Sequence, residues 1–324
     1  MIVRKLGNDH INQTFYPENI TAAISAFRPD GEVPALSEEY WDGGQCRIYK
    51  VHFLDGESWS VRLPIHVQSS SQDTIISVLQ GEQDAPKYCG SSLTFENSVG
   101  FPFMALSWVE GSPLSWSTTE PPRPTRDKVL RQVAEIQTAL IECSKENRGT
   151  ATQYFSRLTE SKLSRVRNGQ LFGITEQDCF CQKNLLHQVL YPELEEAPFA
   201  IDHGDLSPLN IIVDSEYNIT GIIDWGFASK VPLQLAGRLP RILQLSELVL
   251  PPSPTLQEDQ KTYTASLRSH SSQAATWMLL ICSSAEVDFR HCLLESMISK
   301  GMHYSLARLG WALPYQSQHY SLKM

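Results

Sequence analysis

Two short runs of β-branched residues constrain the fold of this chain more than any other feature. The runs cover residues 211–213 and 219–223, and the polar segment 214–218 separates them. β-Branched residues favour strands, and a turn-rich segment between two strands favours a hairpin. Asn210 precedes the first run and Asp224 follows the second. A hairpin therefore predicts that Asn210 and Asp224 lie at the same end of the two strands.

The residues around this hairpin are of the types that phosphoryl transfer from ATP requires. Asp205 precedes Asn210 by five residues and Asp224 by nineteen. In such reactions one carboxylate accepts or orients the proton of the attacking hydroxyl, while an amide and a second carboxylate hold the magnesium that bridges the phosphates. Asp and Asn also occur readily in turns. The order and the spacing therefore carry the prediction, more than the residue types.

The composition excludes several classes of protein. The chain has 324 residues, enough for two lobes, and its hydrophobic fraction of 41% can fill a sizeable core. The formal net charge of −9 argues against a nucleic-acid partner, because backbone phosphates bind clustered Lys and Arg. We expect no signal peptide and no membrane-spanning segment. Seven scattered cysteines without a CxxC pair indicate a reduced, cytoplasmic protein.

The order of the predicted elements indicates an α+β fold with two lobes. Alternating residues on both sides of Asp55 and Gly56 predict a pair of strands within residues 43–64. Residues 101–109 are typical of a buried strand. The strongest helical periodicity comes later, at Val129, Val133, Ile136 and Leu140. Strands thus come first and helices follow, which is not the alternation of a parallel α/β sheet.

Three segments resemble the aminoglycoside phosphotransferase (APH)/choline kinase-like family, in particular its fungal phosphotransferase-like branch. They are residues 203–210, 222–225 and 108–111, and the similarity extends with varying strength over residues 41–241. The resemblance implies a protein-kinase-like fold, in which ATP lies between a mostly β N-lobe and a mostly helical C-lobe.

The resemblance also implies a division of the chain and roles for four residues. Residues 1–40 would form an N-terminal extension, residues 41–110 the nucleotide-binding N-lobe, and residues 111–324 the C-lobe with the catalytic loop, the metal site and a helical acceptor region. The implied roles are catalytic base for Asp205, support of the catalytic loop for His203, and magnesium binding for Asn210 and Asp224.

Arg62 and Glu82 occupy the region where such kinases carry a lysine and a glutamate. The lysine on the third strand neutralises the α- and β-phosphates and pairs with the glutamate of the following helix. Arg62 stands at the lysine position, and arginine can bind phosphate with two nitrogens, although the exchange is not conservative. Glu82 is the nearest candidate partner, but Gly81 and Pro86 shorten its helix. We expect these departures to affect the catalytic rate more than the fold.

Two further segments are candidates for contacts with the nucleotide. Gly43 and Gly44 precede the first predicted strand and could cover the phosphates with backbone N–H groups, although a Gly-Gly pair is also a common turn. Ser107, Trp108 and Val109 form the expected hinge, which would hydrogen-bond adenine through its backbone. An ordinary strand end is the alternative for this segment.

These observations predict an ATP- and magnesium-dependent kinase that phosphorylates a hydroxyl group of a small molecule. The acceptor and the oligomeric state have no signal in the sequence, because kinase-like folds accept many substrates. A nucleotide-binding pseudokinase is the first alternative, which Arg62 and the short helix before Glu82 favour. A protein kinase is the second, weakened by the short segment after Asp224. A metal hydrolase is the third, and it lacks the additional histidines that its site requires.

Overall fold

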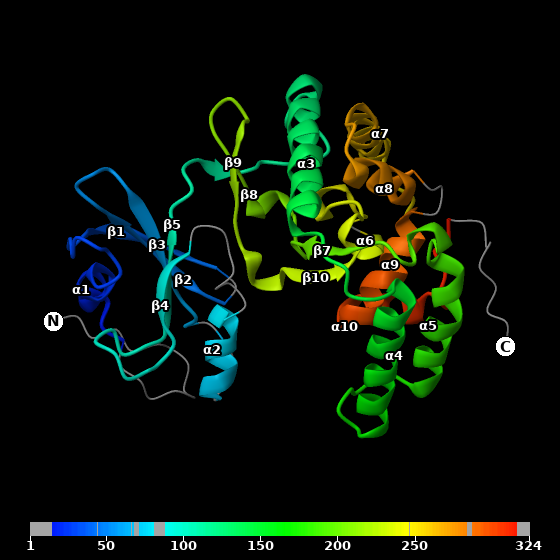
Figure 1. The fold of residues 1–324 in the computed structure, drawn as a ribbon, viewed down its shortest axis with the longest axis horizontal. Helices are drawn as coiled ribbons and strands as arrows, with labels where there is room; N and C mark the ends of the chain where they lie inside the picture. Colours follow the sequence, from blue (N-terminus) through cyan, green and yellow to red (C-terminus); the bar gives the residue numbers. More distant parts are fainter. Residues whose placement is uncertain are drawn as a thin grey trace. The chain divides into compact units, whose positions relative to one another are not determined.

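The computed structural model divides into two compact units (Figure 1). It describes residues 15–43, 45–65, 67, 71–80, 88–245, 247–283 and 287–315. The first unit comprises Met1–Glu110 and Ile223–Phe227, and the second comprises Gly111–Ile222 and Ala228–Met324.

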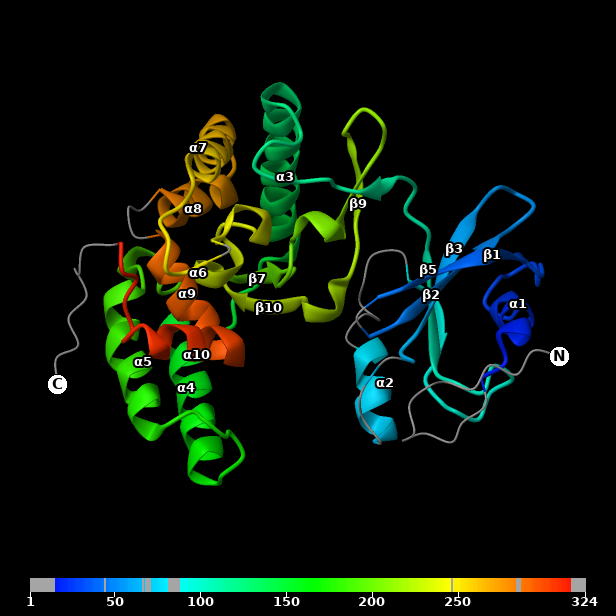
Figure 2. The ribbon, with the colours of Figure 1, turned by 180° about the vertical axis from the view of Figure 1, so that it is seen from behind.

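The first unit is built on a five-stranded antiparallel sheet with the order β1-β2-β3-β5-β4 (Figure 2). Its strands are β1 (Ala35–Asp42), β2 (Arg47–His52), β3 (Ser58–Leu63), β4 (Tyr88–Ser92) and β5 (Phe103–Ser107). Two helices accompany the sheet, α1 (Ile20–Ser25) and α2 (Gln72–Gln80), together with the short 3-10 helices Pro17–Asn19 and Trp225–Phe227.

The pair of strands predicted within residues 43–64 is confirmed as β2 and β3. Gly56 has a φ of +88° in the turn, a conformation that glycine adopts without strain. Alternate residues of the two strands point into the core of the first unit, among them Tyr49, Val51 and Val61. Because side chains alternate along a strand, Lys50 and the nearby Arg62 lie on the opposite face of the sheet.

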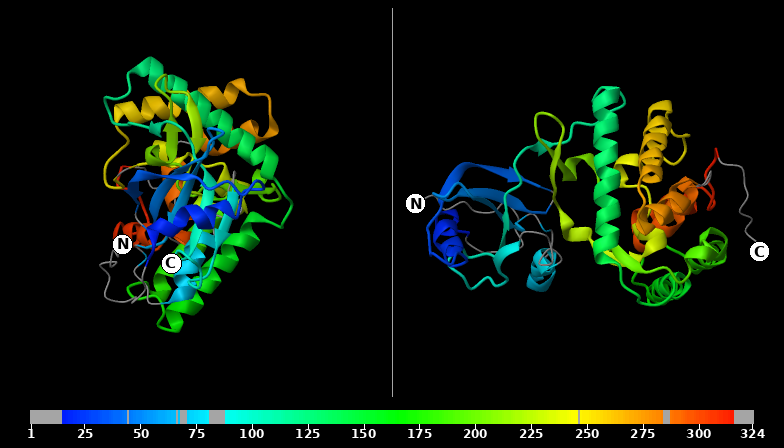
Figure 3. Two further views of the ribbon diagram at one scale, coloured as in Figure 1. Left: turned by 90° about the vertical axis from the view of Figure 1, so that its left-hand side faces the viewer. Right: turned by 45° about the horizontal axis from the view of Figure 1, so that its top comes forward.

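The second unit is mostly helical (Figure 3). Its helices are α3 (Arg123–Ser144), α4 (Ala151–Arg167), α5 (Glu176–Val189), α6 (Leu233–Ala236), α7 (Pro254–Ser269), α8 (Gln273–Cys282), α9 (Val287–Ile298) and α10 (Lys300–Arg308). Helix α3 packs against α7 and α8, and α4 lies beside α5. Short 3-10 helices cover Pro192–Leu194, Pro208–Asn210 and Arg241–Leu243.

Two small sheets lie within the second unit. One pairs β7 (Phe199–Asp202) with β10 (Ser229–Pro232), and the other has the order β6-β8-β9, with strands β6 (Ser112–Pro113), β8 (Ile211–Val213) and β9 (Ile219–Ile222). Strands β8 and β9 are antiparallel and confirm the predicted hairpin. In the turn, the carboxylate of Asp214 accepts hydrogen bonds from the backbone of Glu216 and Asn218, at 2.9 and 2.8 Å.

Local sequence explains where the helices of the second unit begin. Capping boxes begin α4 at Thr150 and α5 at Thr175. In each box the threonine side chain accepts the backbone N–H of the residue three positions later, and the side chain of that residue accepts the backbone N–H of the threonine. The predicted helical periodicity corresponds to α3, whose buried face includes Val129 and Val133. That face also carries Arg126, a buried charge that the apolar periodicity does not reveal.

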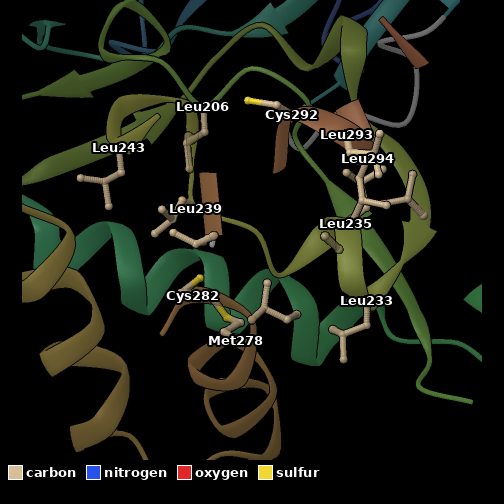
Figure 4. Close-up of a cluster of buried hydrophobic side chains, with 14 of the residues drawn as sticks. Leu206, Leu233, Leu235, Leu239, Leu243, Met278, Cys282, Cys292, Leu293 and Leu294 are labelled. Atoms are coloured by element: carbon tan, nitrogen blue, oxygen red, sulfur yellow. The ribbon is translucent and has the colours of Figure 1, made fainter. Parts of the chain in front are cut away.

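The core of the second unit reaches the predicted catalytic loop, residues 203–210. Leu206 belongs to the same buried cluster as Leu239, Leu243, Met278 and Cys282 (Figure 4). Apolar side chains from α6, α8 and α9 belong to this cluster as well. In the part of the chain that the structure describes, no helix is long and apolar enough to cross a membrane.

Candidate active site

The predicted catalytic loop joins β7 to β8 and is closed by its own backbone. The N–H of Ser207 donates to the carbonyl of Asp205 at 2.9 Å, and the N–H of Asn210 donates to the carbonyl of Ser207 at 3.0 Å. The carbonyl of Leu206 accepts from the N–H of Ile242 at 3.0 Å, which connects the loop to the Arg241–Leu243 turn. These bonds hold the backbone of the loop in a closed turn.

Asn210 fixes the predicted catalytic base directly. Its Nδ2 atom donates to the carbonyl oxygen of Asp205 at 2.8 Å and to the Oδ2 atom of the same residue at 3.1 Å. Asn210 is buried, whereas Asp205 is partly exposed. Among the described residues, the Oδ1 atoms of Asn210 and Asp205 have no hydrogen-bond donor. One side-chain oxygen of each residue therefore accepts no hydrogen bond from the described residues of the second unit.

His203 is buried and contacts the backbone of Asp205. Its Nδ1 atom accepts the Asp205 N–H at 3.3 Å, so the proton of the neutral ring lies on Nε2. Through this bond the histidine acts on the position of the loop.

The hairpin brings the two ends of the motif to one side. Ile211 at the start of β8 is paired with Ile222 at the end of β9. Asn210 immediately precedes Ile211, and the chain leaves β9 toward Asp224 at that same end of the hairpin. Asp224 itself belongs to the first unit, within residues 223–227.

Within the first unit, Arg62 forms an ion pair with Asp224. A guanidinium nitrogen of Arg62 lies 3.6 Å from a carboxylate oxygen of Asp224, and the arginine side chain is 14% exposed. Asp224 has a φ of +62°, which few residues other than glycine adopt. The sequence suggested Glu82 as the partner of Arg62, but Glu82 lies outside the described residues.

The predicted hinge segment uses part of its backbone within the sheet. The N–H of Trp108 donates to the carbonyl of Ser58 at 2.8 Å, and Ser107 is the register partner of Trp59. Val109 has no backbone hydrogen bond among the described residues, so its N–H and carbonyl are the groups of this segment that a base could reach.

An aromatic and charged group on the same face of the sheet was not anticipated from the sequence. The rings of Trp41 and Trp108 lie 5.1 Å apart between centroids, and the Lys50 ammonium lies 4.5 Å from the Trp108 ring centroid. Lys50 also pairs with Glu110 at 3.0 Å. The alternation along β2 could have predicted that Lys50 lies on this face, because Lys50 stands between the two core residues of that strand.

Gly43 takes part in the connection between β1 and β2. Its N–H donates to the carbonyl of Cys46 at 2.8 Å, and a Cβ atom at Gly43 would meet that carbonyl at 3.3 Å. Gly43 is therefore part of a tight turn in this structure. Gly44, the other predicted phosphate-covering glycine, lies outside the described residues.

Comparison with known proteins assigns the chain. The model of the phosphotransferase enzyme family (APH) matches residues 50–233, which is more than half of the chain. The chain belongs to this family. The matched segment contains Arg62, Asp224, the predicted hinge (residues 107–109) and the predicted catalytic loop (residues 203–210). No curated protein matches the chain.

A solved structure confirms the predicted α+β fold class of the chain. The aminoglycoside phosphotransferase APH(2'')-Ib, solved with ADP, matches with a TM-score of 0.51 and 12% identity, over 87% of this chain and 94% of that chain. The GDP complex of an aminoglycoside 2'-phosphotransferase-IIIa variant has a TM-score of 0.48 and 17% identity, over 91% and 96%. The α+β fold thus combines an antiparallel sheet in the first unit with a helical second unit.

Proposed function

We propose that this phosphotransferase transfers the γ-phosphoryl group of ATP to a hydroxyl group of a small molecule in the presence of magnesium. The observation that carries the proposal is the double hydrogen bond from Asn210 to Asp205, because it orients a carboxylate for one specific use of its remaining oxygen. The family match supports the same class of reaction.

The geometry of the loop supports a separate role for each carboxylate oxygen of Asp205. Its Oδ2 atom accepts from Asn210, so Oδ1 is left to accept the proton of the acceptor hydroxyl. The acceptor oxygen is then held for in-line attack, and positioning supplies most of the rate in reactions of this type. His203 holds the backbone of Asp205 and thereby keeps this orientation.

The donor set around the motif fits magnesium. Magnesium binds carboxylate and amide oxygens, and Asn210 and Asp224 supply one of each. Asn210 uses its nitrogen for Asp205, which leaves its amide oxygen for a metal. A magnesium ion held by these residues would neutralise the negative charge of the phosphates. Arg62, which pairs with Asp224, would bind the phosphates of the nucleotide.

The proposed partner is a small molecule in the cytoplasm. The formal net charge of −9 supports this over a nucleic-acid partner. All seven cysteines are free thiols, which supports a reducing compartment. The acceptor itself is best sought by screening hydroxyl-bearing compounds.

A nucleotide-binding pseudokinase is the second candidate function. It is favoured by the ion pair between Arg62 and Asp224. In this pair the residue predicted to bind the phosphates contacts the residue predicted to bind magnesium. Such a protein would bind nucleotide without transferring phosphate, and Asp205→Asn would leave its function intact.

The test combines nucleotide binding with phosphate transfer in two variants. Thermal unfolding is measured with ATP, with and without magnesium, for the wild type, Asp224→Ala and Asp205→Asn. A ligand at 100 times its Kd adds about 2.7 kcal/mol of stability. We expect magnesium-dependent stabilisation of the wild type and of Asp205→Asn, and its loss in Asp224→Ala. Glu216→Ala, in the exposed hairpin turn, is the control.

Phosphate transfer from labelled ATP to a panel of small hydroxyl compounds then separates the two candidates. Transfer by the wild type that Asp205→Asn abolishes supports the kinase. Magnesium-dependent binding without transfer across the panel supports the pseudokinase. Wild-type protein that ATP and magnesium do not stabilise contradicts both.

A further inference from the structure

The backbone of Gly204, the residue before Asp205, is held on both sides by one largely buried ion pair. Asp202, at the end of β7, accepts the N–H of Gly204 on its Oδ1 atom at 3.1 Å. The Oδ2 atom of Asp202 pairs with the Nη2 atom of Arg238 at 3.1 Å. The same nitrogen of Arg238 donates to the carbonyl of Gly204 at 3.4 Å. Both backbone groups of Gly204 are thus bound by the pair.

Gly204 is the position where the loop needs such support. Its φ is +81°, so the chain turns there in a conformation that glycine permits but does not enforce. Asp205 follows immediately, and a rotation about Gly204 would carry the carboxylate of Asp205 away from its place. External contacts must therefore fix the turn.

Arg238 is itself fixed at its other end. Its Nη1 atom binds Glu295 of α9 at 3.2 Å, and its backbone carbonyl accepts from Gln137 of α3 at 2.8 Å. The next residue, Leu239, lies in the same apolar cluster as Leu206 (Figure 4). Arg238 therefore joins the catalytic loop to α3 and α9, two helices that do not carry the motif.

The burial of Arg238 argues for a specific role. Its side chain is 6% exposed, and burying an ion pair stabilises a fold little or not at all compared with apolar residues of similar size. A planar guanidinium with several fixed donors can hold two carboxylates and a carbonyl at defined angles, which a lysine ammonium cannot do. The arrangement supplies geometry more than stability.

We propose that Arg238 is a positioning residue that sets the orientation of Asp205 through Asp202 and Gly204. The inference rests on the proposed kinase function for its effect on the rate. Its effect on the loop does not depend on that function, so two separate measurements test it.

The chain offers a matched control for substitutions of Arg238. Arg126 of α3 is also 6% exposed in its side chain, pairs with the buried Asp259 at 2.8 Å, and donates to the backbone carbonyls of Ser117 and Glu120. Arg126→Lys thus removes the same type of buried guanidinium from a contact between α3 and α7. It should lower stability without altering the catalytic loop.

The first measurement is hydrogen exchange of the peptide that covers residues 203–210. In Arg238→Lys we expect exchange of this peptide to accelerate by about tenfold or more, while peptides within α3 exchange as in the wild type. Arg126→Lys should leave the loop peptide unchanged. Glu295→Gln is a milder variant, because it keeps Arg238 and Asp202 together, and it serves if Arg238→Lys does not fold. Exchange of the same loop peptide should be faster in Glu295→Gln than in the wild type. The inference is overturned if Arg238→Lys folds and its loop peptide exchanges at the wild-type rate. If only Glu295→Gln folds, the wild-type exchange rate of the loop peptide in that variant overturns the inference.

The second measurement is steady-state kinetics once an acceptor is known. A displacement of about 1 Å from the reacting geometry can cost about 100-fold in rate. We expect Arg238→Lys to lower kcat by about 10- to 100-fold with the KM for ATP within about twofold of the wild type, because orientation acts in the transition state. Loss of kcat in Arg126→Lys to the same degree would show a general structural effect and overturn the inference. Wild-type protein without transfer contradicts the proposed function alone, since the exchange measurement still decides the role of Arg238.

Discussion

Arg62 on β3 and Asp224 beyond β9 form an ion pair, with a guanidinium nitrogen 3.6 Å from a carboxylate oxygen. The two residues were predicted for separate tasks, Arg62 for the phosphates and Asp224 for the metal. Their contact links these tasks, because a carboxylate bound to a guanidinium offers less negative charge to a magnesium ion. A nucleotide phosphate that draws Arg62 away would release Asp224 for the metal.

Arg62→Met should therefore have opposite effects on the two ligands. The KM for ATP should rise by about tenfold or more, since a hydrogen bond to a charged group contributes about 1.5–3 kcal/mol. The magnesium concentration at half-maximal activity should fall, because Asp224 loses its competing cation. Initial rates across a magnesium titration at several ATP concentrations measure both quantities.

Arg62→Lys is the matched variant for this experiment. It keeps the charge on a shorter, unforked side chain and should give intermediate values. A magnesium requirement that rises or stays constant in Arg62→Met would contradict the competition between the guanidinium and the metal.

Asn210→Asp should shift the pH dependence of the reaction. The new carboxylate would lie beside the Oδ2 atom of Asp205, where Asn210 now donates at 3.1 Å. A like charge at this distance raises the pKa of a carboxyl group. The base must be deprotonated to act, so the acid limb of kcat/KM should move to higher pH. Rates between about pH 4 and 8 measure the shift.

Asn210→Ala separates charge from the loss of the hydrogen bond. It removes the donor without adding a carboxylate, so the acid limb should move less than in Asn210→Asp. An equal shift in both variants would show that repulsion between carboxylates plays no part.

Gly111→Ala should destabilise the second unit strongly. Gly111 has a φ of +125°, and a Cβ atom there would overlap the carbonyl oxygen of Val213 on β8. The backbone of β8 cannot move aside without breaking its pairing with β6. We expect a loss of about 3 kcal/mol or more in the free energy of unfolding in urea.

Gly169→Ala isolates the conformational part of this effect. Gly169 has a φ of +68° with no atom within 4 Å of a Cβ position. Its substitution should cost about 1–2 kcal/mol, from the left-handed backbone alone. Equal losses in both variants would show that the carbonyl of Val213 moves aside at no cost.

The sequence predicted those parts of the site that depend on local patterns. The β-branched runs around residues 214–218 determine the hairpin, and alternation determines β2 and β3, because each depends on neighbours in the chain. The contact between Gly204 and Arg238 is different in kind, since it spans 34 residues. Nothing in the sequence distinguishes the buried Arg238 from Arg241, which is about half exposed. Only the packing of α6 and α9 makes that distinction.

Lys162→Met should alter stability in alkaline solution. Burial lowers the pKa of Lys162 to about 8, while its ammonium donates to the carbonyl of Ser296 at 2.6 Å. In the unfolded chain this lysine has a pKa near 10.4, so the unfolded state binds more protons than the folded state between about pH 8 and 10.4. In that window the free energy of unfolding gains up to about 1.4 kcal/mol per pH unit from this group. Lys162→Met should lose this contribution, as urea unfolding at several pH values would show.

His303→Phe should act in the opposite pH range, since burial lowers the pKa of His303 to about 4. The positive charge of Lys162, whose Nζ atom lies 3.4 Å from His303 Nδ1, lowers it further. An unfolded histidine titrates near pH 6.5, so the unfolded chain binds more protons between about pH 4 and 6.5. The free energy of unfolding should therefore fall as the pH is lowered through this window.

Phenylalanine preserves the ring that packs against Trp311 at 5.1 Å between centroids and removes the titration. The difference between wild type and His303→Phe in urea unfolding should thus change by up to about 1.4 kcal/mol per pH unit below pH 6.5 and stay constant above it. Lys162→Met is the control, because it should retain most of the acid dependence. A difference between wild type and His303→Phe that is constant from pH 4 to 7 would show that His303 accepts a proton in the folded protein as readily as in the unfolded chain.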